Sequence, residues 1–142
     1  MRSTLAVAAA ATFVIGAALA PLAQAAPAAP SKTKIVACTN AGTVLETKPK
    51  SYILTCADAN SLLKDLKWSS WTSGTAKATG IFQENDCKPN CAAGKFIDAP
   101  ATVSLTVPKT IDGNRVFTSI TVTTSSNGKT HRQVYEAPRL TK

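Results

Sequence analysis

The chain has little of what histidine or metal catalysis requires, because its 142 residues include one histidine, His131. A Ser-His-Asp triad needs a histidine base, and His131 lies in a polar stretch typical of a surface position. A zinc site needs four ligands, and Cys87-x-x-x-Cys91 supplies only two. We therefore expect no catalytic triad and no metal site.

Motifs for phosphate, dinucleotide and EF-hand calcium binding are also missing, and no Cys-x-x-Cys redox pair occurs. Paired carboxylates stay open as an alternative, because distant acidic residues can meet in a fold. Their spacing gives no support to such a pair; they are Asp58, Asp65, Glu84, Asp86, Asp98 and Asp112. The sequence thus predicts a protein that is not an enzyme and that carries no cofactor.

Long apolar runs are confined to the N-terminus. Arg2 precedes an Ala-rich apolar stretch over residues 5–20, and Ala23-Gln24-Ala25 follows it. This three-part pattern predicts a secretory signal peptide over residues 1–25. No later stretch is apolar and long enough for a membrane span. We expect a secreted protein without stable membrane insertion after cleavage, and a flexible Pro/Ala/Lys tether over residues 26–33.

A lipoprotein is the alternative reading of the N-terminus, because Ile35-Val36-Ala37-Cys38 matches the local pattern of a lipid-attachment box. A lipidated cysteine must directly follow the apolar region, whereas the tether intervenes here. The alternation around Ile35 favours a first strand instead.

Acidic residues are scarce relative to basic ones. Loss of the signal peptide leaves 117 residues, with 15 basic and 8 acidic side chains and a net charge of +7. The basic residues are scattered singly, with no basic run and no basic helix, so we expect no nucleic-acid partner. Dispersed charge favours an ordinary solvated surface over attraction to anionic envelope polymers or membrane surfaces.

Threonine is abundant, with 17 copies in the 117 residues. β-branched residues favour strands, and Gly and Pro punctuate the chain at short intervals. The sequence therefore predicts a single domain over residues 34–142 of the all-β class. We expect a small, disulfide-stapled β-sandwich or barrel of about 6–8 antiparallel strands.

The four cysteines form an even set in a chain with an export signal, which indicates two disulfides with three alternative pairings. We predict Cys38–Cys56, which would join two neighbouring strands, and Cys87–Cys91, which encloses the turn-forming Lys88-Pro89-Asn90. Loop-closure entropy assigns them about 3 and about 2 kcal/mol of stability. The turn also accounts for the nearby polar residues Asn85, Asp86 and Asn90 better than a calcium site does.

Two independent features of the sequence predict the same hairpin. Residues 101–107 and 116–122 alternate between apolar and polar, and Asp112-Gly113 between them favours a primed turn. That turn would pair Val103 with Val122 and Leu105 with Ile120 on one face. Pro108 cannot donate to a ladder and therefore predicts an edge or a bulge.

A second hairpin is predicted around Ser73-Gly74, with Trp68 opposite Thr79 and Trp71 opposite Ala76. In this register the two tryptophans face opposite sides of the sheet. Trp71 and the nearby Lys67 are then the candidate ligand surface, with Trp71 as an aromatic platform for a sugar. The alternative is that Trp71 fills a hollow under another part of the protein. Upstream, Asp58 predicts the N-cap of a short helical turn over residues 58–63.

Three segments carry a resemblance, namely residues 54–60 (LTCADAN), 66–71 (LKWSSW) and 87–96 (CKPNCAAGKF). Together they resemble a group of small secreted proteins from actinomycetes, which implies a shared domain but no activity. The chain is more loosely similar to the subtilisin-inhibitor family of the same bacteria, whose cysteine spacing differs. No reactive-site residue is carried over.

The first functional hypothesis is a secreted, non-enzymatic binding module of the cell surface or medium. Its partners would be a cell-wall polymer, a polysaccharide or a secreted protein. The second is an inhibitor of an exported protease that presents the Cys87–Cys91 loop. A hydrolase with a carboxylate pair ranks last.

Overall fold

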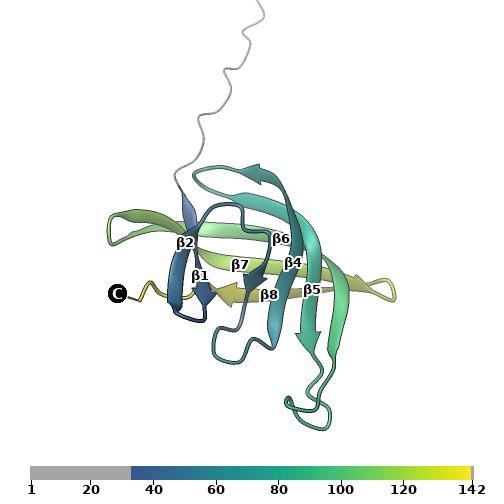
Figure 1. Cartoon of the computed structure of the whole chain (residues 1–142). Helices are drawn as coiled ribbons and strands as arrows, with labels where there is room; N and C mark the ends of the chain where they lie inside the picture. The colour runs from purple at the N-terminus through teal and green to yellow at the C-terminus, as the bar shows by residue number, and fades with distance from the viewer. Residues whose placement is uncertain (1–32, 142) are drawn as a thin grey trace, which may run out of the picture.

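The computed structural model describes residues 33–141, so the predicted signal peptide and nearly all of the tether lie outside the described residues. This part of the chain contains no helix, and thus none long and apolar enough to cross a membrane. The strands are β1 (Lys34–Thr39), β2 (Gly42–Glu46), β3 (Tyr52–Ile53), β4 (Ser61–Trp71), β5 (Ala76–Asn85), β6 (Phe96–Ile111), β7 (Asn114–Ser126) and β8 (Lys129–Glu136). The predicted all-β class is confirmed (Figure 1).

All eight strands belong to one sheet, which curls into a half-barrel in the order β2-β1-β7-β6-β5-β4-β3, with β8 also paired to β7 (Figure 1). The expectation of purely antiparallel pairing is wrong at one place, because β1 and β7 run parallel, with Lys34 opposite Val116 and Ile35 opposite Phe117. β7 has 13 residues, so it pairs with β1 near its start and with β8 along the rest.

The core is the inner face of this curled sheet. Alternate residues of each strand point inward, as the period of two requires. The largest of these side chains are almost fully buried, and they include Phe117, Ile35, Leu63, Leu105 and Ile120. Because no second layer covers this face among the described residues, the curl itself excludes water from it.

Strand β3, at one end of the strand order, is tied to β1, the second strand from the other end. The Tyr52 hydroxyl of β3 donates a hydrogen bond to the Val36 carbonyl of β1 at 2.7 Å. Burial, with a smaller contribution from the charge of Glu46, raises the pKa of this phenol, so it keeps its proton. The Cys38–Cys56 disulfide lies beside this contact and confirms the predicted pairing. The bridge joins segments that are neighbours in space, as expected, but β1 and β3 are not paired in the sheet, because β1 pairs with β2 and β7.

The β6–β7 hairpin has the predicted register, with Val103 opposite Val122 and Leu105 opposite Ile120. Asp112 and Gly113 both have positive φ, 48° and 74°, as a primed turn requires. The ladder between β5 and β6 stops at Leu105, so Pro108 lies where β6 has a neighbour on one side only. The predicted edge position of this proline is confirmed.

The helical turn predicted after Asp58 is absent, and Ser61 already belongs to strand β4. The Asp58 carboxylate instead accepts hydrogen bonds from the backbone N–H and side-chain amide of Asn60. Asp can close such a local turn as readily as it caps a helix, so its side chain alone does not distinguish the two. Thr33, assigned to the tether from the sequence, is buried, so the described fold begins one residue earlier than expected.

Removal of the Cys38–Cys56 bridge should destabilise the protein more than removal of Cys87–Cys91. The sequence separations of 18 and 4 residues imply costs of about 3 and about 2 kcal/mol, because a longer closed loop restricts the unfolded chain more. Urea denaturation of the two double cysteine-to-alanine variants measures the difference. The reverse order would contradict the loop-length argument.

Candidate functional site

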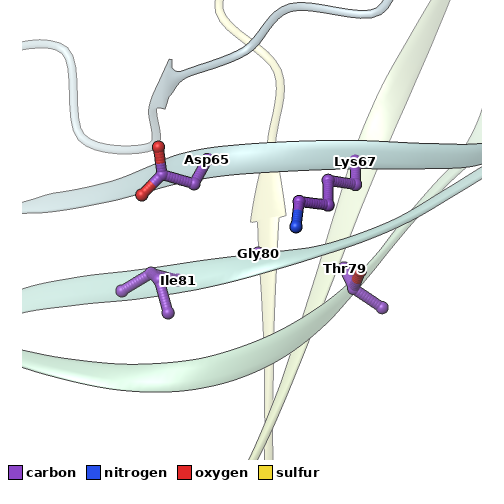
Figure 2. A pocket seen from close by; sticks show the side chains of 5 residues that line it. All are labelled: Asp65, Lys67, Thr79, Gly80 and Ile81. Carbon is purple, nitrogen blue, oxygen red and sulfur yellow. The ribbon is translucent and has the colours of Figure 1, made fainter.

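The two residues of the predicted ligand surface lie on opposite faces of β4. Lys67 is exposed on the convex face, where Figure 2 shows it beside Thr79 and Gly80 of β5. Trp71 is half-buried against the core and donates from Nε1 to the Thr33 carbonyl at 2.7 Å. Its ring meets Phe117 edge to face, with centroids 5.6 Å apart. The structure therefore does not bring Trp71 and Lys67 together into one surface.

Two irregularities in β4 cause this arrangement. The register shifts between Lys64 and Lys67 and again between Trp68 and Ser70. Trp71 still pairs with Ala76 as predicted, but Trp68 pairs with Ala78 rather than Thr79. A β-bulge adds a residue to one strand, so it reverses the face of every residue that follows. The prediction that the two tryptophans face opposite sides is therefore wrong, and their ring centroids are 4.6 Å apart.

The connection between β5 and β6, residues 86–95, protrudes from the opposite end of the sheet from the β4–β5 turn (Figure 1). We call this connection, with the first two residues of β6, the loop end (residues 86–97). The Cys87–Cys91 disulfide closes a small ring at its start, as the sequence predicts. The ring exposes Lys88, Pro89 and Asn90 to solvent.

The buried side chain of Asn85 holds this ring in place. Its Nδ2 donates to the Cys91 carbonyl at 2.8 Å and to Asn60 Oδ1 at 3.0 Å, while its Oδ1 accepts from the Cys87 N–H at 2.9 Å. The amide thus links both halves of the ring to the loop before β4. A calcium ion would need these same oxygens, so the structure accounts for Asn85 without one.

Asp86 fixes the two sides of the loop to each other. Its Oδ1 accepts from the Lys95 N–H at 2.9 Å and from the Lys88 N–H at 3.1 Å, and its own N–H donates to the Lys95 carbonyl. The hydrogen bond from Lys95, followed by that from Lys88, lowers the pKa of the carboxyl. The loop is therefore held as one piece by a disulfide, an amide and a carboxylate.

Two large apolar side chains directly follow the braced loop. Phe96 is 48% exposed and Ile97 is 59% exposed. Ile97, but not Phe96, borders an open hollow of about 470 Å³ on the concave side, lined by Phe82, Glu84, Asn85, Asp86, Lys88, Ile97, Ala99, Thr124 and Ser126. Phe96 and Ile97 were not expected at the surface, because an apolar pair at the start of a strand normally indicates core.

The hollow is lined by two acidic side chains, Glu84 and Asp86. The Asp86 carboxylate is already committed to two backbone N–H groups. Tyr135 lies on the same concave side, and burial, with a contribution from Glu84, raises the pKa of its phenol, which donates to Gln133 Oε1. Neither Asp86 nor Tyr135 is placed to take up a proton from a substrate near neutral pH.

Metal-binding geometry does not arise within residues 33–141, where no three side chains of His, Cys, Asp or Glu gather to hold an ion. His131 is exposed on β8, opposite Thr124 of β7. The Asp98 carboxylate has two side-chain partners. Gln83 Nε2 donates a hydrogen bond to it at 2.6 Å, and Lys64 Nζ forms an ion pair with it at 3.1 Å. These contacts lower the pKa of its carboxyl.

Replacement of Asp86 by Asn should lower the melting temperature near neutral pH. It should also make the melting temperature less dependent on pH in the acidic range. The folded pKa of Asp86 lies below the unfolded value of about 3.9, so its stabilisation is present above that pH and is lost as pH falls through the folded pKa. Thermal melts from neutral to strongly acidic pH should therefore show two curves that converge in acid. Asp112→Asn, which removes a carboxylate without hydrogen bonds, is the control; an equal effect there would contradict the role of Asp86.

No protein-family model, no curated protein and no solved structure matches this chain. The resemblance to small secreted actinomycete proteins therefore stays a prediction from three sequence segments. What the chain can bind follows from the geometry of its own residues, above all from the braced loop end.

Proposed function

We propose that this chain is an exported, non-enzymatic binding protein that uses its loop end to bind another protein. The observation that carries the proposal is the combination of a braced, protruding loop with two exposed apolar residues at its base. Ile97, which lines the hollow, would be the main anchor, Phe96 would add apolar surface on the other face of the strand end, and Lys88 and Lys95 would supply basic groups beside them.

The energetics of association favour this part of the molecule. A loop that is already held by Cys87–Cys91 and Asp86 loses little conformational entropy when it binds. Burial of an aromatic and an aliphatic side chain at the centre of an interface supplies much of the affinity in typical complexes. The basic groups match a partner with an apolar pocket bordered by acidic residues.

Export is part of the same proposal. The support comes from the three-part signal pattern over residues 1–25 and from two disulfides, which are compatible with an extracellular protein. Cys38 is bonded to Cys56, so its sulfur is not available for the lipid attachment considered from the sequence.

Inhibition of an exported protease is a second candidate function, because a rigid loop that presents Lys88 has the outline of an inhibitory loop. Two features weigh against Lys88 as the residue that enters a protease pocket. The bond after it leads to Pro89, which has no N–H and a fixed φ. The bond also lies within a five-residue ring, whereas a substrate strand is extended.

The purified protein should therefore not inhibit trypsin. A titration of trypsin with the wild-type chain, with hydrolysis of a small chromogenic peptide as the readout, measures this. Inhibition that disappears in Lys88→Ala would contradict our ranking and would place the protease inhibitor first.

The loop end itself is tested by the double variant Phe96→Ser/Ile97→Ser. Immobilised wild-type protein should capture a partner from culture supernatant or isolated cell wall, and this variant should lose it. The matched control is Val44→Ser/Val134→Ser, which removes two apolar side chains of similar exposure, 40% and 62%, from other strands. Each pair should change stability by no more than about 1 kcal/mol, as exposed positions usually do. Equal capture by both double variants would contradict the proposed interface.

A further inference from the structure

A second surface, distant from the loop end, lies on the convex face of the sheet. Five side chains follow one another across five strands in register: Lys67 of β4, Thr79 of β5, Thr102 of β6, Thr123 of β7 and Arg132 of β8. We call them the convex row. Neighbouring strands lie about 4.8 Å apart, so the row spans roughly 19 Å.

The convex row faces solvent. Its residues alternate along their strands with the core residues Ala78, Ala101, Val103 and Val122, so they point to the opposite side. The main contacts between strands within residues 33–141 involve sheet neighbours and the β1–β3 closure.

The polar groups of the row are uncommitted. Within the described structure, the three threonine hydroxyls, the Lys67 ammonium and the Arg132 guanidinium have no hydrogen bond or ion pair to other side chains or to the backbone. A second in-register row beside it adds Lys77, Ser104 and Thr121. The face therefore presents a field of hydroxyl groups with a cation at each end.

The surface is hollowed along the row. Asp65, Lys67, Thr79, Gly80 and Ile81 line an open depression of about 540 Å³ at the β4 end (Figure 2). A second depression shares Thr79 and Gly80 with the first and continues to Thr102 and Thr123. The two hollows form one shallow track across the strands.

The β-bulge in β4 shapes this track. Asp65 has a positive φ of 52°, and the β4 backbone approaches β5 so closely that a Cβ on Gly80 would lie 2.7 Å from the Lys64 carbonyl oxygen. Gly80 is therefore required for this approach. The same bulge places Lys67 on the convex face and in register with Thr79.

We propose that the convex row binds a linear acidic polysaccharide with uronate groups. Lys67 and Arg132 would pair with carboxylates, and the threonine hydroxyls, which both donate and accept, would bond the hydroxyl groups of the sugars between them. A polyanion without hydroxyl groups would leave the middle of the row unmatched. This surface is separate from the loop end and does not depend on the proposed protein partner.

Asp65 gives the proposal a distinctive consequence. Its carboxylate lines the same hollow as Lys67 and would repel an acidic chain (Figure 2). Asn tolerates positive φ, so Asp65→Asn should keep the bulge and remove only the charge. This variant should bind the polysaccharide more tightly than the wild type, by about twofold to threefold.

Polygalacturonate, a linear polyuronate, is the probe, and its affinity for the purified protein is measured at low and at physiological ionic strength. Lys67→Ala/Arg132→Ala should weaken binding about tenfold. Lys50→Ala/Lys109→Ala is the control with the same change in net charge, and it should change the affinity by less than about twofold. Thr102→Val, which keeps shape and charge, should weaken binding by a few-fold.

Four results would overturn the proposal: unchanged affinity in the Lys67/Arg132 variant, an equal loss in the Lys50/Lys109 control, no gain in Asp65→Asn, or equal binding of inorganic polyphosphate. Equal loss in the control would mean that net charge alone attracts the polymer. The Phe96/Ile97 variant should bind polygalacturonate as the wild type does, so the outcomes for the two surfaces are distinguishable.

Discussion

The rest of the structure depends on the closure of one sheet upon itself. A sheet that buries its inner face without a second layer must curl until its two ends meet, because otherwise the core would be open to water. Here β1 and β3 meet, and the Tyr52 hydroxyl and the Cys38–Cys56 bridge hold them together. Burial raises the pKa of Tyr52, so its hydroxyl keeps the proton that it donates near neutral pH.

The closure also explains why the two ends of the half-barrel differ. At the β4–β5 turn, Trp68 and Trp71 fill the inner space, and Trp71 is bonded to the Thr33 carbonyl. At the other end a hollow stays open beside the β5–β6 loop, lined by polar residues as well as by Phe82 and Ile97. The filled end stabilises the fold, and the proposed binding surface lies at the other end, with the hollow and the braced loop.

The residues of the convex face are not constrained by core packing. Outward residues contribute nothing to the core, and in the middle of β6 and β7 they are largely Thr and Ser, which fit a pleated surface and stay in contact with water. Because the strands are in register, these hydroxyl groups line up across the sheet. Basic residues that are dispersed along the chain, Lys67 and Arg132, come to the two ends of one row. Dispersed charge in a sequence is therefore compatible with an ordered arrangement in space.

The sequence by itself determined the strand class and the β6–β7 register, and it predicted the short Cys87–Cys91 bridge. Each of these depends on residues close in the chain or on a strict period of two: Asp112-Gly113 sets the turn, and Val103 must share a face with Val122. Only the tertiary structure decided the parallel pairing of β1 with β7, the β4 bulges and the exposure of Phe96 and Ile97. The position of the β4 bulge depends on the close approach of β4 to Gly80 of β5. The exposure of a residue on a strand depends on whether another part of the chain covers it. Neither property leaves a local pattern in the sequence.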